Sequence, residues 1–154
     1  PNYLDYGLEK WSDRVKSSAA MKIKFISKDP YEKGVRAALN LGHTIGHALE
    51  MVSDFKIRHG EAVSIGMVLE ARLAERMNLA EAGLADAVAE VLNSLGLPVV
   101  LPQDLNINLV QTAIENDKKR QNGKVRFALP VRIGDYKLVY PSVERIYEVL
   151  KGEI

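Results

Sequence analysis

The sequence predicts a mainly α domain made of several helices, with one small β element near residues 124–140. Apolar residues recur at helical spacing through most of the chain. Two turn signals, Asn122-Gly123 and Gly134-Asp135, accompany short stretches that alternate like strands. The 154 residues are 47% hydrophobic and 27% charged, which suits one globular domain with a sizeable core. We therefore expect residues 1–154 to form a single domain.

Two helices are expected before the first turn of the chain. A short helix is predicted over Leu4–Trp11. Ser12 or Asp13 can then cap a second helix to about Ser27, because such side chains accept from the free N–H groups of a first helical turn. Pro30 disfavours helical backbone at the residue before it and should end this helix.

The segment Gly34–Val52 is predicted to be one helix that carries a polar stripe. At 3.6 residues per turn, four of its polar residues fall at i, i+4, i+7 and i+11 and share one face. These residues are Arg36, Asn40, His43 and His47. Glu50 continues the stripe one turn further. A face that collects a guanidinium, a carboxamide and two imidazoles is typical of an active-site wall.

The rest of the chain is predicted to supply four more helices and two strands. Helices are expected over Gly60–Met77, over Gly83–Leu95, from Asp104 or Asn106 to about Asn116, and from a Ser142 cap to about Leu150. Strands are expected over Lys124–Leu129 and Tyr136–Tyr140, each next to one of the turn signals.

Charge and cysteine usage narrow the function classes. The net charge is +1, so charge gives no reason to expect a nucleic-acid or membrane partner. Cysteine is absent, which leaves His, Asp and Glu as the strong metal ligands and fits a reducing compartment. No apolar run approaches about 18 residues and no signal segment opens the chain, so we expect a soluble, cytoplasmic protein. Because the chain starts at Pro1 without a methionine, we expect it to be part of a longer protein.

All three histidines fall within 17 residues, and this favours a metal or catalytic site. His43 and His47 are four residues apart, so their rings can converge on one point, as in helical zinc sites. His59 can join them from the start of the next helix. Three imidazoles, or two and a carboxylate, would leave a coordination position open for substrate. The alternative is that these are ordinary core or surface histidines, since H-x-x-x-H arises often by chance.

The charged clusters allow two interpretations each. Asp117-Lys118-Lys119-Arg120 is more simply a solvated helix end, because cations favour helix C-termini. The same cluster could also clamp a phosphate or carboxylate. Glu32 and Arg36 are spaced for a helical ion pair. No Ser-His-Asp arrangement, P-loop or G-x-G-x-x-G motif is present.

Three blocks of the sequence resemble those of the 3-dehydroquinate synthases. That family carries a lysine, then fourteen positions later R-A-x-L-N-x-G-H-T-x-G-H-A-x-E, then H-G-E-A-V-x-x-G-M, and further on D-K-K, a glycine and F-x-L-P-x-x-I-G. The chain has Lys22, the block from Arg36 to Glu50, the block from His59 to Met67, and then Asp117-Lys118-Lys119, Gly123 and Phe127–Gly134. The match spans roughly residues 20–135 in the right order and at the right intervals.

The resemblance implies a two-domain enzyme of which this chain is the C-terminal, mostly helical metal domain. The NAD-binding α/β domain would lie outside the chain, which then supplies no cofactor-binding residue for NAD. The family's Zn²⁺, or another divalent metal such as Co²⁺, has a glutamate and two histidines as ligands. His43 and His59 match the histidines, and the glutamate segment would lie upstream of Pro1. His47 matches an active-site histidine that is not a ligand, which revises the pairing of His43 with His47.

Further site residues are also implied by the resemblance. Residues that match the family's substrate-binding positions are Lys22, Arg36, Asn40 and one of Lys118 and Lys119, with Lys118 favoured. His47, together with Lys22, Arg36 and Asn40, forms the implied catalytic set, and Glu32 matches a position near the site.

The implied activity is that of a phosphate-eliminating carbon–oxygen lyase. It converts 3-deoxy-D-arabino-heptulosonate 7-phosphate to 3-dehydroquinate and phosphate, in the shikimate pathway to aromatic amino acids. The chain alone is expected to be inactive. Implied partners are the sugar phosphate, the NAD-binding domain and, as one allowed assembly, a second copy in a homodimer. The alternatives are another sugar-phosphate cyclase, a metal-dependent polyol dehydrogenase of the same architecture, or a non-catalytic phosphate-binding module.

Overall fold

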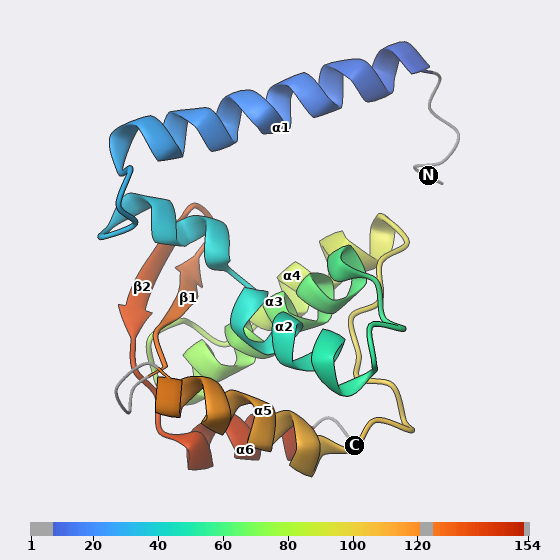
Figure 1. Cartoon of the computed structure of the whole chain (residues 1–154), viewed down its shortest axis with the longest axis vertical. Coiled ribbons are helices and arrows are strands. Elements are labelled where there is room, and N and C mark those ends of the chain that lie inside the picture. The colour runs from blue at the N-terminus through green and yellow to red at the C-terminus, as the bar shows by residue number, and fades with distance from the viewer. Residues whose placement is uncertain (1–7, 121–124, 153–154) are drawn as a thin grey trace.

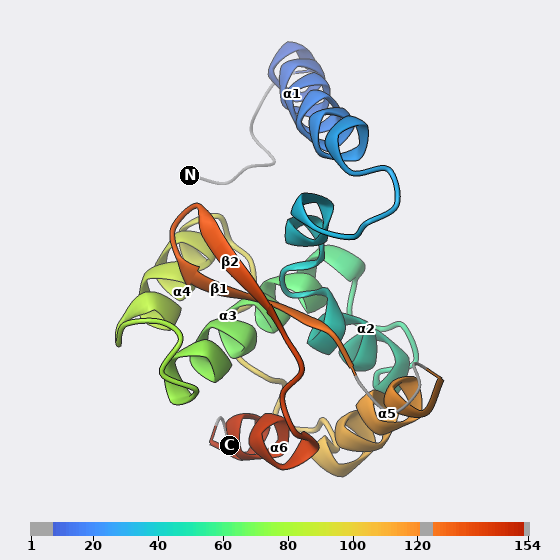
Figure 2. The same ribbon diagram turned by 90° about the vertical axis from the view of Figure 1, so that its left-hand side faces the viewer.

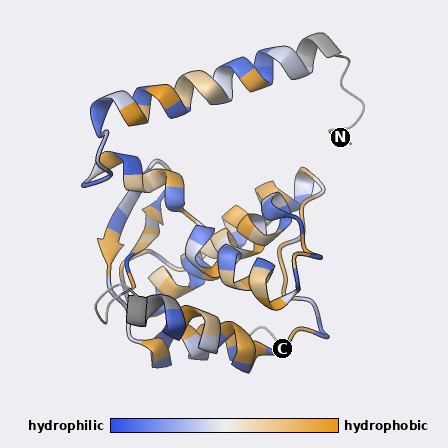
Figure 3. Ribbon diagram, viewed as in Figure 1, coloured by the Kyte–Doolittle hydropathy of each residue, from blue (hydrophilic) through white to orange (hydrophobic). Residues whose placement is uncertain are grey.

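The computed structural model describes residues 8–120 and 125–152 and begins with a long helix, α1 (Leu8–Lys28). In Figures 1 and 2 this helix projects away from the other helices, and most of its side chains are exposed. Hydrophilic and hydrophobic residues are interspersed along it (Figure 3). The predicted break at Ser12 or Asp13 is wrong, because neither Gly nor Pro interrupts the helical hydrogen bonds over this range. Pro30 follows its end, as predicted.

The predicted single helix over Gly34–Val52 is also wrong. It is divided into a 3-10 helix, η2 (Val35–Asn40), and an α-helix, α2 (His43–Val52). Gly42, between them, has a φ of 77°, a left-handed conformation that glycine adopts readily. A Cβ at this position would lie 2.6 Å from the carbonyl oxygen of Val63, so the neighbouring helix leaves no room for one. The break gives η2 and α2 different directions.

Helix α3 (His59–Arg76) is the central element and contacts α2, α4, α6 and β1. Helix α4 (Leu84–Ser94) packs on α3, whereas α5 (Ile107–Arg120) packs on α2 and α6 (Val143–Lys151). The largest buried apolar side chains come from α2, α3, β1 and α6 and include Ile45, Leu49, Ile65, Leu69, Leu73, Phe127, Ile146 and Leu150. The four helices lie within a few residues of their predicted positions. Ser142 caps α6, as expected, by accepting from the N–H of Arg145.

The β element is an antiparallel hairpin of β1 (Phe127–Arg132) and β2 (Asp135–Val139), in which Phe127 pairs with Val139. The first strand begins later than predicted and runs through Pro130, which a two-stranded sheet tolerates because each strand has an unpaired edge. Phe127, Ala128 and Leu129 are all buried, since β1 contacts α3 as well as η2 and β2. The predicted turn at Asn122-Gly123 falls outside the described residues. The fold class, mainly α with one small β element, is confirmed.

Among the described helices, none combines the length and apolar character that crossing a membrane requires.

Candidate functional site

The three histidine rings come together where the N-terminal end of α3 meets α2. The ring centroids of His43 and His47 are 5.5 Å apart, those of His43 and His59 are 5.3 Å apart, and those of His47 and His59 are 5.9 Å apart. Sequence spacing predicted the first pair and allowed His59 to join it from the next helix, and the structure places the His59 ring beside both. We call these three residues the histidine cluster.

Glycines allow α2 and α3 to approach closely enough to form the cluster. A Cβ on Gly66 would collide with the backbone of Gly42 and lie 3.0 Å from the N atom of Gly46. A Cβ on Gly46 would lie 3.2 Å from the carbonyl group of Ala62. Contacts below about 3.4 Å are tighter than packed atoms accept, so larger residues here would separate the two helices.

Hydrogen bonds orient two of the three rings. The Nδ1 atom of His43 lies 3.1 Å from the carbonyl oxygen of Leu41, and that of His59 lies 3.2 Å from Oε2 of Glu50. Both oxygens are acceptors, so each Nδ1 carries the proton when the ring is neutral and Nε2 keeps its lone pair. An imidazole held in this way through its second nitrogen is typical of a metal ligand. Burial lowers the pKa of His43, which keeps it in the neutral form that binds metal.

A second set of possible ligands overlaps the first. Ligand atoms of His47, Glu50 and His59 all lie within 4.8 Å of one another. In this arrangement Glu50 would bind the metal directly, whereas in the arrangement implied by the resemblance it would orient His59. Both sets contain His59. The first adds His43 and a glutamate from outside the chain, and the second adds His47 and Glu50. The predicted ligands His43 and His59 therefore remain a prediction, which the Nδ1 contacts support.

A cavity of about 500 Å³ opens beside the cluster. Its lining includes His43, His47 and Asn40, together with Glu32, Ala113 and Arg126. This volume lies within the range of about 300–1,000 Å³ usual for small-molecule sites.

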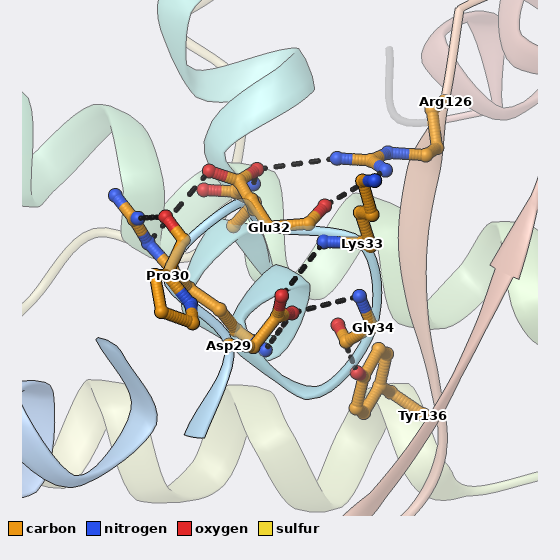
Figure 4. Close-up of polar contacts among 9 residues, drawn as sticks. Asp29, Pro30, Glu32, Lys33, Gly34, Arg126 and Tyr136 are labelled. Atoms are coloured by element: carbon orange, nitrogen blue, oxygen red, sulfur yellow. Dashed lines mark hydrogen bonds and ion pairs between the residues drawn. The ribbon is translucent and has the colours of Figure 1, made fainter. Parts of the chain in front are cut away.

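Glu32, which also lines the cavity, gathers several polar side chains around its carboxylate (Figure 4). Its Oε1 atom accepts from Nδ2 of Asn40 at 2.5 Å and from a guanidinium nitrogen of Arg126 at 3.2 Å. Its Oε2 atom lies 3.9 Å from Nε of Arg36. Arg126 also donates to the Glu32 carbonyl oxygen at 3.2 Å. We call Glu32, Arg36, Asn40 and Arg126 the arginine network.

Asp29 holds the backbone of residues 33–36, next to this network. Its carboxylate accepts from the N–H groups of Lys33 at 2.9 Å, Gly34 at 2.7 Å and Arg36 at 3.1 Å. The Lys33 N–H, joined by those of Gly34 and Arg36, lowers the pKa of Asp29. The hydroxyl of Tyr136 donates to the carbonyl oxygen of Gly34 at 2.9 Å, so the hairpin helps to fix the start of η2 (Figure 4).

The remaining predicted residues are placed as follows. Lys22 lies on the exposed part of α1. Lys118 and Lys119 belong to the last turn of α5, and their side chains lie outside the described part of the structure. Sequence reasoning missed Arg126 and gave Glu50 no role with His59. Arg126 directly precedes the F-x-L-P block, but no spacing pattern connects it with Glu32, 94 residues earlier.

The family model and the curated relatives that match this chain point to the same family. The family model described as 3-dehydroquinate synthase C-terminal matches residues 2–120. A curated 3-dehydroquinate synthase from Pyrococcus furiosus is 41% identical over 139 residues, which cover 86% of this chain and 40% of that protein. One from a Synechococcus species is 43% identical over 141 residues, covering 90% and 38%. The chain thus spans about two fifths of the length of these relatives.

Solved structures of two other synthases share the fold of this chain. The structure of a 2-deoxy-scyllo-inosose synthase complexed with carbaglucose-6-phosphate, NAD⁺ and Co²⁺ has a TM-score of 0.85 and 26% identity. It covers 97% of this chain, and the match covers 42% of that chain. ValA, a 2-epi-5-epi-valiolone synthase from Streptomyces hygroscopicus with NAD⁺ and Zn²⁺ bound, has a TM-score of 0.74 and 26% identity, covering 90% and 38%.

Proposed function

Because the chain belongs to the 3-dehydroquinate synthase family, we propose that it is the metal- and substrate-binding domain of an enzyme acting on 3-deoxy-D-arabino-heptulosonate 7-phosphate. The products are 3-dehydroquinate and phosphate, which makes the whole enzyme a phosphate-eliminating lyase of the shikimate pathway. One observation carries the proposal: one cavity is lined both by His43 and His47 of the histidine cluster and by members of the arginine network, namely Glu32, Asn40 and Arg126. A metal-binding group and an anion-binding group are thereby brought within reach of one small substrate.

The donor set fits a divalent metal such as Zn²⁺ or Co²⁺. His43 and His59 present Nε2, and their Nδ1 atoms are occupied by oxygen acceptors. A carboxylate from outside the chain completes this set in our proposal. When bound, the metal supplies a Lewis acid that favours ionisation of a substrate hydroxyl.

The residues of the chain itself bind, orient and move protons. The guanidinium groups of Arg36 and Arg126 favour the anionic ends of the substrate, and a planar guanidinium can grip an oxyanion with two parallel bonds. Asn40 can donate to a substrate hydroxyl while Glu32 holds its amide. His47 lies beside the other two rings, where an imidazole can take and return a proton near neutral pH.

Fixing two ends of a flexible sugar phosphate can lower the activation barrier of the reaction considerably. Holding reacting groups in a productive orientation can contribute up to ~7–11 kcal/mol of the barrier. Lys22, and Lys118 or Lys119, add further cations in our proposal and favour departure of the phosphate. NAD would be held mainly by a domain outside this chain and would supply a reversible hydride acceptor.

Product analysis of the full-length protein that contains this chain tests the proposal. We expect release of inorganic phosphate and formation of 3-dehydroquinate from the heptulosonate 7-phosphate, with NAD and Zn²⁺ or Co²⁺ present. A matched reaction with glucose 6-phosphate tests the second candidate, a cyclase that acts on another sugar phosphate. The structural similarity to 2-deoxy-scyllo-inosose synthase favours that candidate. If the protein turns over glucose 6-phosphate and not the heptulosonate 7-phosphate, the proposal is wrong and the second candidate replaces it. Oxidation of a polyol without phosphate release would indicate a dehydrogenase.

A further inference from the structure

Glu70 is a fully buried carboxylic acid in α3 whose side chain reaches the start of α2. Its exposed fraction is 0%. Its Oε2 atom accepts from the N–H of Gly42 at 2.6 Å, and its Oε1 atom accepts from the N–H of Ile45 at 3.4 Å. A buried acid among apolar side chains is costly unless such donors satisfy it. Glu70 therefore needs an explanation beyond the packing of the core.

The start of α2 has no capping side chain of its own. The first helical N–H groups have no partner within the helix, and a Ser, Thr, Asp or Asn side chain usually accepts from them. Here the cap position is Gly42, and the space its Cβ would need is taken by Val63 and Met67. Glu70 supplies the missing acceptor from the neighbouring helix.

The contact with Gly42 continues to the histidine cluster through a single peptide group. The Gly42 N–H and the Leu41 carbonyl belong to the same planar trans peptide, so they point in opposite directions. The N–H end bonds to Glu70, and the carbonyl end lies 3.1 Å from Nδ1 of His43. The orientation of this peptide therefore depends on Glu70, and the orientation of the His43 ring depends on the peptide.

We propose that Glu70 is a positioning residue for His43, acting through the Leu41–Gly42 peptide. It holds the peptide so that its carbonyl fixes the proton on Nδ1 of His43 and leaves Nε2 free toward the cluster. The contact with Ile45 fixes the backbone on the other side of His43. The functional meaning rests on the proposed metal site, whereas the positioning itself can be tested without metal.

The test compares three variants of the chain. Glu70→Met matches the length of the side chain and removes both acceptors. Glu70→Gln keeps one neutral acceptor oxygen and should rescue part of the effect. Ser64→Ala is the matched control, because Ser64 is also buried in α3 and bonds to a backbone carbonyl, that of Pro98 at 2.7 Å. That contact joins α3 to the segment that follows α4, and not to α2.

Nuclear magnetic resonance at neutral pH gives the deciding readouts: the tautomer of His43 from its ring nitrogens and the exchange rate of the Gly42 amide proton. We expect Glu70→Met to lose the Nδ1–H preference and to speed Gly42 exchange at least tenfold. Glu70→Gln should be intermediate, and Ser64→Ala should match the unmodified chain. An unchanged His43 tautomer in folded Glu70→Met would overturn the proposal. If Glu70→Met does not fold, an unchanged tautomer and an unchanged Gly42 exchange rate in Glu70→Gln would do so.

Co²⁺ titration of the full-length protein, which contains the carboxylate that completes the proposed set, then connects the positioning to the metal site. Changing groups that orient a ligand typically weakens metal binding by about 10–100-fold, so we expect about a tenfold loss in Glu70→Met and less than twofold in Ser64→Ala. A tautomer effect in the chain, together with no Co²⁺ binding by the full-length protein, would count against the proposed metal site and support the role of Glu70. Co²⁺ binding without the tautomer effect would support the metal site and count against the role of Glu70.

Discussion

His43 of the histidine cluster is fixed by buried backbone contacts, whereas the arginine network is held by partly exposed side chains. At the cluster, Gly42 and Gly66 bring two helices into contact, and the buried Glu70 closes the start of α2. In the network, the side chains of Glu32 and Arg126 are each 32% exposed. Such ion pairs are screened by solvent and contribute little individually. Substitutions that disturb the cluster should therefore have large effects on stability or metal content, and substitutions in the network should have small effects on substrate binding.

The largest effect is expected at the contact between α2 and α3. In Gly66→Ala the new methyl group would collide with the Gly42 backbone and lie 3.0 Å from the N atom of Gly46, and backbone atoms cannot yield as a flexible side chain can. Overpacking typically costs about 1–3 kcal/mol, and we expect a loss of about 3 kcal/mol or more here. Urea unfolding followed by circular dichroism measures it.

Gly60→Ala is the matched control for this substitution. Gly60 lies in the first turn of the same helix, and nothing lies within 4 Å of the place its Cβ would take. Because alanine favours helix over glycine by up to about 1 kcal/mol, this variant should be unchanged or slightly more stable. A loss equal to that of Gly66→Ala would contradict the packing explanation.

Metal content separates the two possible ligand sets of the cluster. In the full-length protein, we expect His43→Ala and His59→Ala to lose the metal, because each removes one of three protein ligands in our proposal. His47→Ala should lower turnover and largely keep the metal. Elemental analysis of the purified variants decides between the sets. Loss of metal in His47→Ala, with retention in His43→Ala, would instead select the set of His47, Glu50 and His59.

Glu70 should give the domain an unusual pH dependence. Burial raises its pKa from 4.5 to about 8, although backbone N–H groups act in the opposite direction. Between these values the unfolded chain has released this proton and the folded chain has kept it, so stability falls as pH rises. The slope is up to about 1.4 kcal/mol per pH unit and disappears above the folded pKa.

Comparison with Glu70→Gln isolates this effect, because glutamine does not titrate. Between about pH 5 and 8, the stability of the unmodified chain should decrease relative to that of the variant. Thermal or urea unfolding at several pH values measures the difference. Parallel curves for the two proteins would show that Glu70 titrates normally in the folded state.

Sequence patterns located elements that are determined locally. Apolar spacing and the Ser142 cap placed α3, α4 and α6, and the turn signal at Gly134-Asp135 placed the turn of the hairpin. The break at Gly42 was missed because the spacing of apolar and polar residues continues through it at the helical period, although a glycine can end a helix. The contact with α3 excludes a side chain at this position. Glu70 likewise has an ordinary helical environment in sequence. Its burial depends on the position of the α2 N-terminus, 28 residues earlier in the chain.

The same reasoning applies to the candidate site. The spacing of His43 and His47 and the resemblance of three blocks identified the cluster before its geometry was known. The predicted stripe was correct from His43 to His47, which share α2, and failed between Asn40 and His43, where the helix is broken. Arg126 was missed because its partner is far away in sequence, and long-range pairs of surface charge have no local pattern.

The smallest effect is expected from Arg126 in the arginine network. Arg126→Met removes the donors to both the side chain and the carbonyl of Glu32. The variant also removes the guanidinium that faces the substrate anion in our proposal. A partly exposed charge contact of this kind contributes roughly 0.2–1 kcal/mol, so we expect KM for the heptulosonate 7-phosphate to rise about two- to fivefold in the full-length enzyme. Arg132→Met is the control, because Arg132 is 78% exposed and pairs with Asp135 in the same hairpin. We expect it to leave KM unchanged, and metal content should be unchanged in both variants. Equal changes in KM would show that Arg126 acts only through hairpin stability, and loss of metal in Arg126→Met would show that the cluster and the network are not independent.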